Sequence, residues 1–134
     1  MAKKNRSGCP IASGLEIVGD RWTLVVLRDM LTGKCKYADF IDSPEKITTN
    51  ILASRLSQME ENGLILKREY QTNPTRYSYY LTQKGADLLP LVQSLTRWSN
   101  AHLAHTWTPP AYFMEMTPQQ AAKAGANHQP DRGA

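Results

Sequence analysis

The side chains best suited to chemistry with another molecule are the short amides and hydroxyls between Thr48 and Ser57. On a helix that turns about 100° per residue, Asn50, Ser54 and Ser57 share one face, opposite a face of apolar side chains. An exposed helix face normally carries Lys, Glu or Arg, which favour the helix and solubility. Asn can instead hydrogen-bond an adenine edge in the DNA major groove, with hydroxyls beside it. The pattern therefore predicts a helix whose polar face lies against DNA.

The borders of this helix are also marked in the sequence. Thr48 is the predicted N-cap and Gly63 the predicted C-terminal stop. The apolar face, which must be buried, consists of Leu52, Leu56 and Met59. The residues expected to face DNA are Thr48, Thr49, Asn50, Ala53, Ser54 and Ser57. Ile51 lies near the exposed side, where it either contacts a thymine methyl group or packs on a neighbouring loop.

Basic and polar side chains lie on both sides of this helix along the chain. Leu64–Tyr70 and Arg76–Leu81 are rich in β-forming residues and flank the turn Gln71–Thr75, which predicts a β-hairpin. The side chains expected to reach phosphates or the adjacent minor groove are Thr72, Asn73 and Arg76 in the hairpin and Lys34 and Lys36 ahead of the helix. An ordinary solvated hairpin is the alternative.

The remaining elements follow from apolar periodicity and from Pro and Gly. Helices are predicted at about 9–18, 21–31, 37–40, 49–62 and 83–105. Asp20 and Thr82 are expected to cap the second and the last, and Pro90 to bend the last near its first turns. This order predicts a mainly α fold with a β-hairpin, the winged helix-turn-helix, whose second helix of the pair enters the major groove.

Length and charge fit one DNA-binding domain. The chain has 134 residues, a net charge of +4 and 41% hydrophobic residues, and no apolar run reaches the length of a membrane span. A positive charge favours an anionic partner because binding to phosphates releases counterions.

We expect a basic flexible arm at 1–8, one domain at 9–107 and a low-complexity, disordered tail at 108–134, with room for one short helix after Thr117-Pro118. With no signal peptide apparent, a cytoplasmic protein without membrane contact is expected.

Nothing in the sequence favours catalysis or a cofactor. It contains no Gly-rich phosphate loop, no HExxH motif and no nucleophile elbow. His102 and His105 share a helix face, but no Cys, Asp or Glu nearby in sequence completes a metal site, so a polar helix end is expected. The competing class is a winged helix used for protein–protein contact without direct DNA recognition.

An ordered set of short motifs carries a resemblance to a known family. The motifs are Cys9-Pro-Ile, Gly19-Asp-Arg-Trp-Thr-Leu-Val-Val-Leu-Arg28, Tyr37-Ala-Asp-Phe40, Ile47-Thr-Thr-Asn-Ile-Leu-Ala-Ser-Arg-Leu56, Met59-Glu-Glu-Asn-Gly-Leu-Ile65 and Tyr79-Tyr-Leu-Thr-Gln-Lys-Gly85. Together, from about Cys9 to about Trp98, they resemble the HxlR-type transcriptional regulators, a branch related to the MarR regulators. The resemblance implies a homodimeric winged-helix regulator built through helices near 11–18 and 83–105. Such a dimer recognises a pseudo-palindrome on double-stranded DNA.

The resemblance also draws attention to Cys9. Several members of the family sense quinones, aldehydes or hypochlorite through a cysteine at this position, which implies a small electrophile or oxidant as effector. A helix start and the basic arm favour the thiolate, the form that is oxidised or alkylated. A structural or incidental thiol is the alternative. Cys35, between Lys34 and Lys36, is a candidate second reactive thiol.

Overall fold

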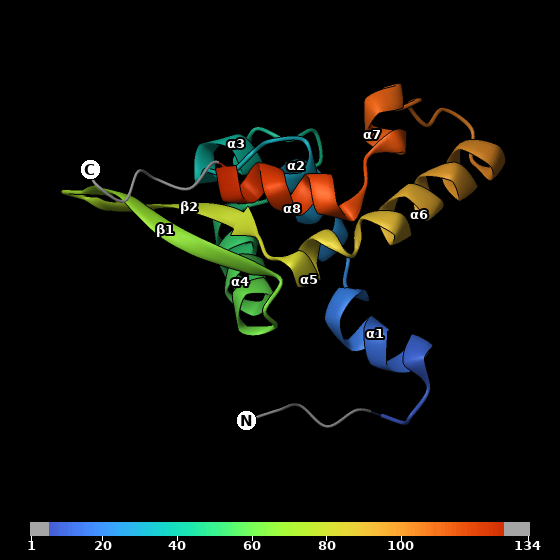
Figure 1. Cartoon of the computed structure of the whole chain (residues 1–134), viewed down its shortest axis with the longest axis horizontal. Helices are drawn as coiled ribbons and strands as arrows, with labels where there is room; N and C mark the ends of the chain where they lie inside the picture. The colour runs from blue at the N-terminus through green and yellow to red at the C-terminus, as the bar shows by residue number, and fades with distance from the viewer. Residues whose placement is uncertain (1–5, 128–134) are drawn as a thin grey trace.

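The structure is a computed structural model that describes residues 6–127, and it has the predicted winged helix-turn-helix fold (Figure 1). The elements in chain order are α1 (Pro10–Val18), α2 (Thr23–Leu31), α3 (Tyr37–Ile41), α4 (Thr49–Glu61), β1 (Ile65–Thr72), β2 (Thr75–Leu81), α5 (Gln83–Ala86), α6 (Leu89–His102), α7 (Ala111–Glu115) and α8 (Pro118–Asn127). Within the described residues no helix is long and apolar enough to cross a membrane.

The core lies where α2, α4, the hairpin and the start of α6 meet. Leu52, Leu56 and Met59 on α4 are at most 2% exposed, which confirms the apolar face predicted for this helix. They pack in one cluster with Leu27 of α2 and Phe40 of α3. Because these side chains are close-packed and out of water, the opposite face of α4 is held outward.

Both ends of α4 are fixed by local hydrogen bonds. The Ile51 N–H donates to Thr48 Oγ1 over 3.3 Å, which confirms the N-cap. At the other end Gly63 has φ +77°, and the Gly63 and Leu64 N–H groups donate to the carbonyls of Glu60 and Met59. This pair of bonds closes the last turn and requires a left-handed residue, which glycine supplies without strain.

The hairpin forms as predicted, with longer strands. The pairing runs from Ile65 opposite Leu81 to Thr72 opposite Thr75, with an irregularity between Glu69 and Gln71. The turn is therefore shorter than the predicted 71–75 segment. The chain ahead of α3 lies along the open edge of β2, because the Tyr79 N–H donates to the Cys35 carbonyl over 2.8 Å.

The single helix predicted at 83–105 is wrong, because the structure divides it into α5 and α6. Thr82 caps α5 as expected, accepting a bond from the Gly85 N–H over 3.1 Å. The chain then leaves the helix at Asp87 and Leu88. Pro90 lies in the first turn of α6, where the backbone N–H has no partner within the helix and proline can lack it at no cost. Pro90 therefore starts a new helix and does not bend a longer one.

We expected a disordered tail from residue 108, but the structure shows two helices there, α7 and α8. Phe113 is 4% and Ala121 5% exposed, and both join the core. The buried Gln93 amide nitrogen donates to the carbonyls of Phe113, Met114 and Met116 over 3.0, 3.2 and 2.9 Å. In Figure 1, α8 lies beside α5 and across β2, which it contacts. The short helix expected after Thr117-Pro118 is α8; residues 1–5 of the expected arm and 128–134 of the expected tail lie outside the described residues.

Candidate nucleic-acid interface

The outward face of α4 is small, polar and open. Thr48, Thr49, Asn50, Ala53, Ser54 and Ser57 are all exposed. Within the described residues, neither Asn50 nor Ser57 has a side-chain hydrogen bond to another group, and Ser54 Oγ accepts only a long bond of 3.4 Å from Arg55. These side chains therefore have donors and acceptors left for bases, the chemistry that major-groove recognition needs.

An ion pair between α4 and the start of α2 borders this face. Arg55 Nη1 lies 3.3 Å from Asp20 Oδ2. Helix α2 begins at Thr23, two residues later than predicted, so its N-cap is Trp22 and not the predicted Asp20. The Asp20 carboxylate still accepts from the Trp22 and Thr23 N–H groups over 2.8 and 2.9 Å. Burial raises the pKa of Asp20, but hydrogen bonds from Thr23 and Trp22 and the charge of Arg55 outweigh it and hold the pKa below its usual value. The sequence did not show the ion pair, whose partners lie far apart in the chain.

A shallow hollow of about 400 Å³ opens between these two elements, lined by Asp20, Trp22, Asn50, Ile51, Ser54 and Arg55. Ile51 is 36% exposed at its edge. Its position beside Asn50 suits contact with a thymine methyl group, one of the two alternatives left open by the sequence.

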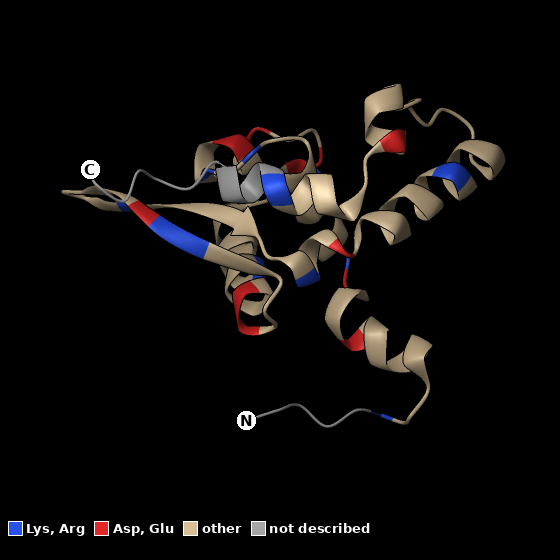
Figure 2. Cartoon of the chain, in the orientation of Figure 1, with Lys and Arg blue, Asp and Glu red and all other residues tan. Residues whose placement is uncertain are grey.

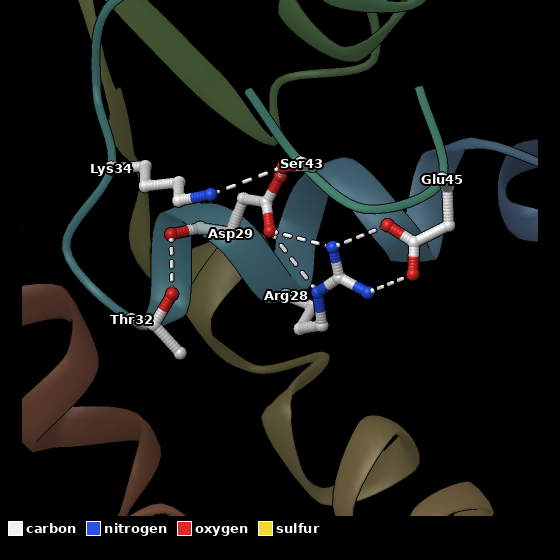
Figure 3. A network of polar contacts seen from close by, with 6 residues as sticks. All are labelled: Arg28, Asp29, Thr32, Lys34, Ser43 and Glu45. Atoms are coloured by element: carbon white, nitrogen blue, oxygen red, sulfur yellow. Dashed lines mark hydrogen bonds and ion pairs between the residues drawn. The ribbon is translucent and has the colours of Figure 1, made fainter. Parts of the chain in front are cut away.

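The loop that leads into α4 is held by a charged network (Figure 3). Arg28 makes two hydrogen bonds to the Glu45 carboxylate, of 2.7 and 2.9 Å, and two to Asp29 Oδ1, of 2.8 and 3.1 Å. The Ser43 hydroxyl donates to the other oxygen of the buried Asp29. Hydrogen bonds from Arg28 hold the pKa of Glu45 below its ordinary value of 4.5, against a smaller upward effect of burial. The network ties the turn between α3 and α4 to the central helix α2.

The two lysines predicted at phosphates differ in accessibility. Lys34 is half-buried, and its Nζ donates to Ser43 Oγ over 3.1 Å, so part of its bonding capacity is used within the protein (Figure 3). Lys36 is exposed, with its Nζ 4.4 Å from the centre of the Tyr70 ring. Lys36 is therefore better placed than Lys34 for the predicted contact with a phosphate.

The tip of the hairpin is open to solvent. Thr72, Asn73 and Arg76 are exposed, and the tip is braced by a 3.1 Å hydrogen bond from Gln71 Nε2 to the Pro74 carbonyl. Figure 2 also shows basic residues in the middle of β1. These are Lys67, 4.5 Å from the Tyr77 ring, and Arg68, whose buried Nε has no hydrogen-bond partner within the described residues. Neither residue was predicted from the sequence to contact DNA, although both lie in a predicted strand of the wing.

Helices α1 and α6 carry large apolar side chains that are strongly exposed in one copy of the chain. The most exposed are Ile11 and Leu15 on α1, at 74 and 49%, and Leu91, Leu95 and Trp98 on α6, at 43, 48 and 56%. Figures 1 and 2 show both helices standing out from the winged body and carrying little charge. We call the exposed apolar side chains of these two helices together the α1–α6 face.

The two thiols lie in different settings. Cys9 is exposed and directly precedes Pro10, the first residue of α1. The neighbouring Arg6 is paired with Glu16 over 3.3 Å. Cys35 is half-buried on the wall of a cavity described below. Across the described part of the chain, no group of three His, Cys, Asp or Glu side chains is placed to hold a metal ion, and the His102 ring packs against Trp98.

A fixed turn, an outward polar helix and an adjoining basic hairpin define a winged helix-turn-helix DNA-binding protein. The chain belongs to the HxlR-like helix-turn-helix family, whose model matches residues 17–106, and is a transcriptional regulator of the helix-turn-helix type. It is 30% identical over 95 residues to YdeP of Bacillus subtilis (strain 168), an uncharacterised HTH-type transcriptional regulator, covering 71% of this chain and 74% of that one.

Solved structures show the same fold. The redox regulator HypR in its oxidised form superposes with a TM-score of 0.64 and 26% identity, covering 70% of this chain and 97% of HypR. The reduced form of the transcriptional regulator YodB from B. subtilis gives a TM-score of 0.60 at 22% identity, covering 75% of this chain and all of YodB.

Proposed function

We propose that this regulator binds a pseudo-palindromic operator as a homodimer and that its binding is controlled by oxidation or alkylation of Cys9. The observation that carries the proposal is the polar outward face of α4, which is held in place by a fully buried opposite face and a fixed preceding turn. Asn50, Ser54 and Ser57 contact bases, while Lys36 and Arg76 contribute most of the affinity through phosphates.

The α1–α6 face supports the homodimer. Its exposed side chains are large and apolar, and a surface of this kind normally marks an interaction site. A two-fold dimer uses the same surface on both copies, and it places two copies of α4 in successive turns of one DNA face, about 34–36 Å apart. A pseudo-palindromic operator is the matching DNA.

The position of Cys9 supports control by oxidants or electrophiles. Its thiolate can form a bond to an electrophilic carbon. An oxidant that donates oxygen, such as hypochlorite, takes two electrons from the thiolate and leaves a sulfenic acid, whereas diamide takes two electrons from a pair of thiols and leaves a disulfide. Cys9 stands two residues before Ile11, so a modified thiol places a new polar group at the edge of the α1–α6 face. HypR, a relative in fold, is itself described as a redox regulator.

A gel-shift assay with DNA from upstream of the protein's own gene and of adjacent genes tests this function. We expect a specific shift that diamide weakens in the wild type and leaves unchanged in Cys9→Ser. Cys35→Ser is the matched control and keeps the response to diamide. Wild-type binding that is equal with and without diamide contradicts the sensor, and the absence of any specific shift contradicts operator recognition.

A further inference from the structure

A cavity of about 540 Å³ lies between the end of α2, the segment Gly33–Cys35, strand β2 and the helices α7 and α8. Its volume is in the range of about 300–1,000 Å³ that is typical of small-molecule sites. One wall is made by α7 and α8, which lie beyond the residues matched by the family model. The cavity is separate from the outward face of α4 and from the α1–α6 face.

The walls are mainly apolar and aromatic. The side chains that matter for recognition are Met30, Cys35, Tyr80, Tyr112, Glu115 and Met116. Tyrosine rings attract cations through their faces, and methionine sulfur packs well against flat aromatic groups. Such a lining suits a ligand that is largely hydrocarbon.

The charges at the cavity favour a cation. Glu115 is exposed at the wall and has no ion pair or hydrogen bond to another described residue. Lys34 also lines the cavity, but its Nζ is directed to Ser43, within the network that contains Asp29 and Glu45 (Figure 3). The carboxylate of Glu115 is therefore the charge left for a ligand.

We propose that this cavity binds a lipophilic organic cation, with its hydrocarbon part among Tyr80, Tyr112 and the methionines and its charge beside Glu115. The ligand acts as an effector, because the segment Gly33–Cys35 joins the cavity to the recognition helix. Lys34 bonds to Ser43 in the turn before α4, and the Cys35 carbonyl bonds to β2 of the wing. The effector role rests on the proposed function, whereas binding in the cavity does not.

Titration calorimetry with tetraphenylphosphonium, in the absence of DNA, tests the site. Tetraphenylborate has the same shape and the opposite charge, and we expect it to bind about tenfold more weakly. Glu115→Gln weakens tetraphenylphosphonium binding by about threefold, the effect of one partly screened charge. Glu61→Gln, the same change at an exposed position on α4, leaves it unchanged. Equal affinity for the two ions, or no loss in Glu115→Gln, overturns the proposal.

The location is tested by thiol protection. Cys9→Ser leaves Cys35 as the sole cysteine, and saturating tetraphenylphosphonium slows its reaction with a maleimide. Unchanged labelling in the presence of bound cation places the ligand elsewhere and overturns the site. In gel shifts the cation changes operator affinity of the wild type more than that of Glu115→Gln. If the cation binds but does not change the affinity of a protein that does shift operator DNA, only the effector role is overturned. If the protein binds no operator DNA at all, the proposed function fails and the result on the cavity still holds.

Discussion

Asn50 is positioned by the cap and the buried face of its own helix. The Thr48 cap fixes where α4 begins, and buried Leu52 and Leu56 fix how the helix is rotated. These determinants lie within a few residues of Asn50 in the chain, which is why the sequence predicted its exposure correctly. The hollow beside it was not predictable, because Asp20 and Trp22 reach it from the segment ahead of α2.

Replacing Asn50 tests base recognition. Asn50→Ala is expected to weaken operator binding by about 1–3 kcal/mol, because a bidentate contact to a base is lost. Binding to random DNA of the same length is unaffected, and paired titrations by fluorescence anisotropy measure both. An equal loss on the two DNAs would mean that Asn50 does not recognise a base.

Replacing Arg76 tests the wing. Arg76→Ala removes an exposed positive charge at the hairpin tip, and each lost phosphate contact lowers the slope of log K against log salt by about 1. Operator titrations between low and moderate salt give the slope. Lys123→Ala, an exposed charge on α8, is the control and keeps the wild-type slope. A wild-type slope in Arg76→Ala rules out the phosphate contact.

At the scale of elements, the turn before α4 depends on charges that are distant in sequence. Arg28 and Glu45 are separated by 17 positions and meet only because α2 and the turn pack together. No local pattern marks such a pair. The same reason hid the packing of α7 and α8 on the core, since the end of the chain, rich in Ala, Gln, Gly and Pro, resembled a disordered tail, while the residue that holds this segment, Gln93, lies on α6. The sequence predicted elements with strong local signals and missed those stabilised from afar.

The Arg28–Glu45 pair gives the turn a measurable pH dependence. Glu45→Gln is expected to lower the free energy of unfolding at pH 7 by about 0.5–1 kcal/mol, since the pair is partly solvated. The pKa of Glu45 is lowered in the folded state, so its contribution is full above the unfolded value of 4.5 and is lost as pH falls below it. Urea titrations of wild type and variant between pH 7 and pH 4 should show their difference narrowing. A constant difference would contradict a charge-dependent contribution.

At the scale of the whole molecule, the exposed apolar surface is concentrated away from the DNA-binding face. It is carried by α1, which has no buried residue, and by the outward side of α6, whose other side packs into the core through Leu89 and Val92. The resemblance to the HxlR-type regulators implied the two helices as the dimer interface. In the proposed dimer, a second copy covers this face and brings two recognition helices to one operator.

Replacing Leu95 tests the dimer. Leu95→Glu puts a charge in the middle of the α1–α6 face and is expected to give a monomer with at least about tenfold weaker operator binding, since half of the contacts are lost. Light scattering after size exclusion measures the mass. Tyr70→Glu, at an exposed apolar position on the wing, keeps the dimer. An unchanged mass for Leu95→Glu would place the interface elsewhere.

The hydrogen bonds from the Gln93 amide to the carbonyls of the α7 segment also constrain how the protein folds during synthesis. Gln93 leaves the ribosome before its three acceptors, which follow 20 to 23 residues later. At about 5–20 residues per second, the chain spends seconds with α6 synthesised and α8 still missing. During that interval Phe113 and Ala121 are absent from the core. Pairing between nascent chains on one messenger would join partners whose cores are incomplete, so the order of synthesis favours assembly after release.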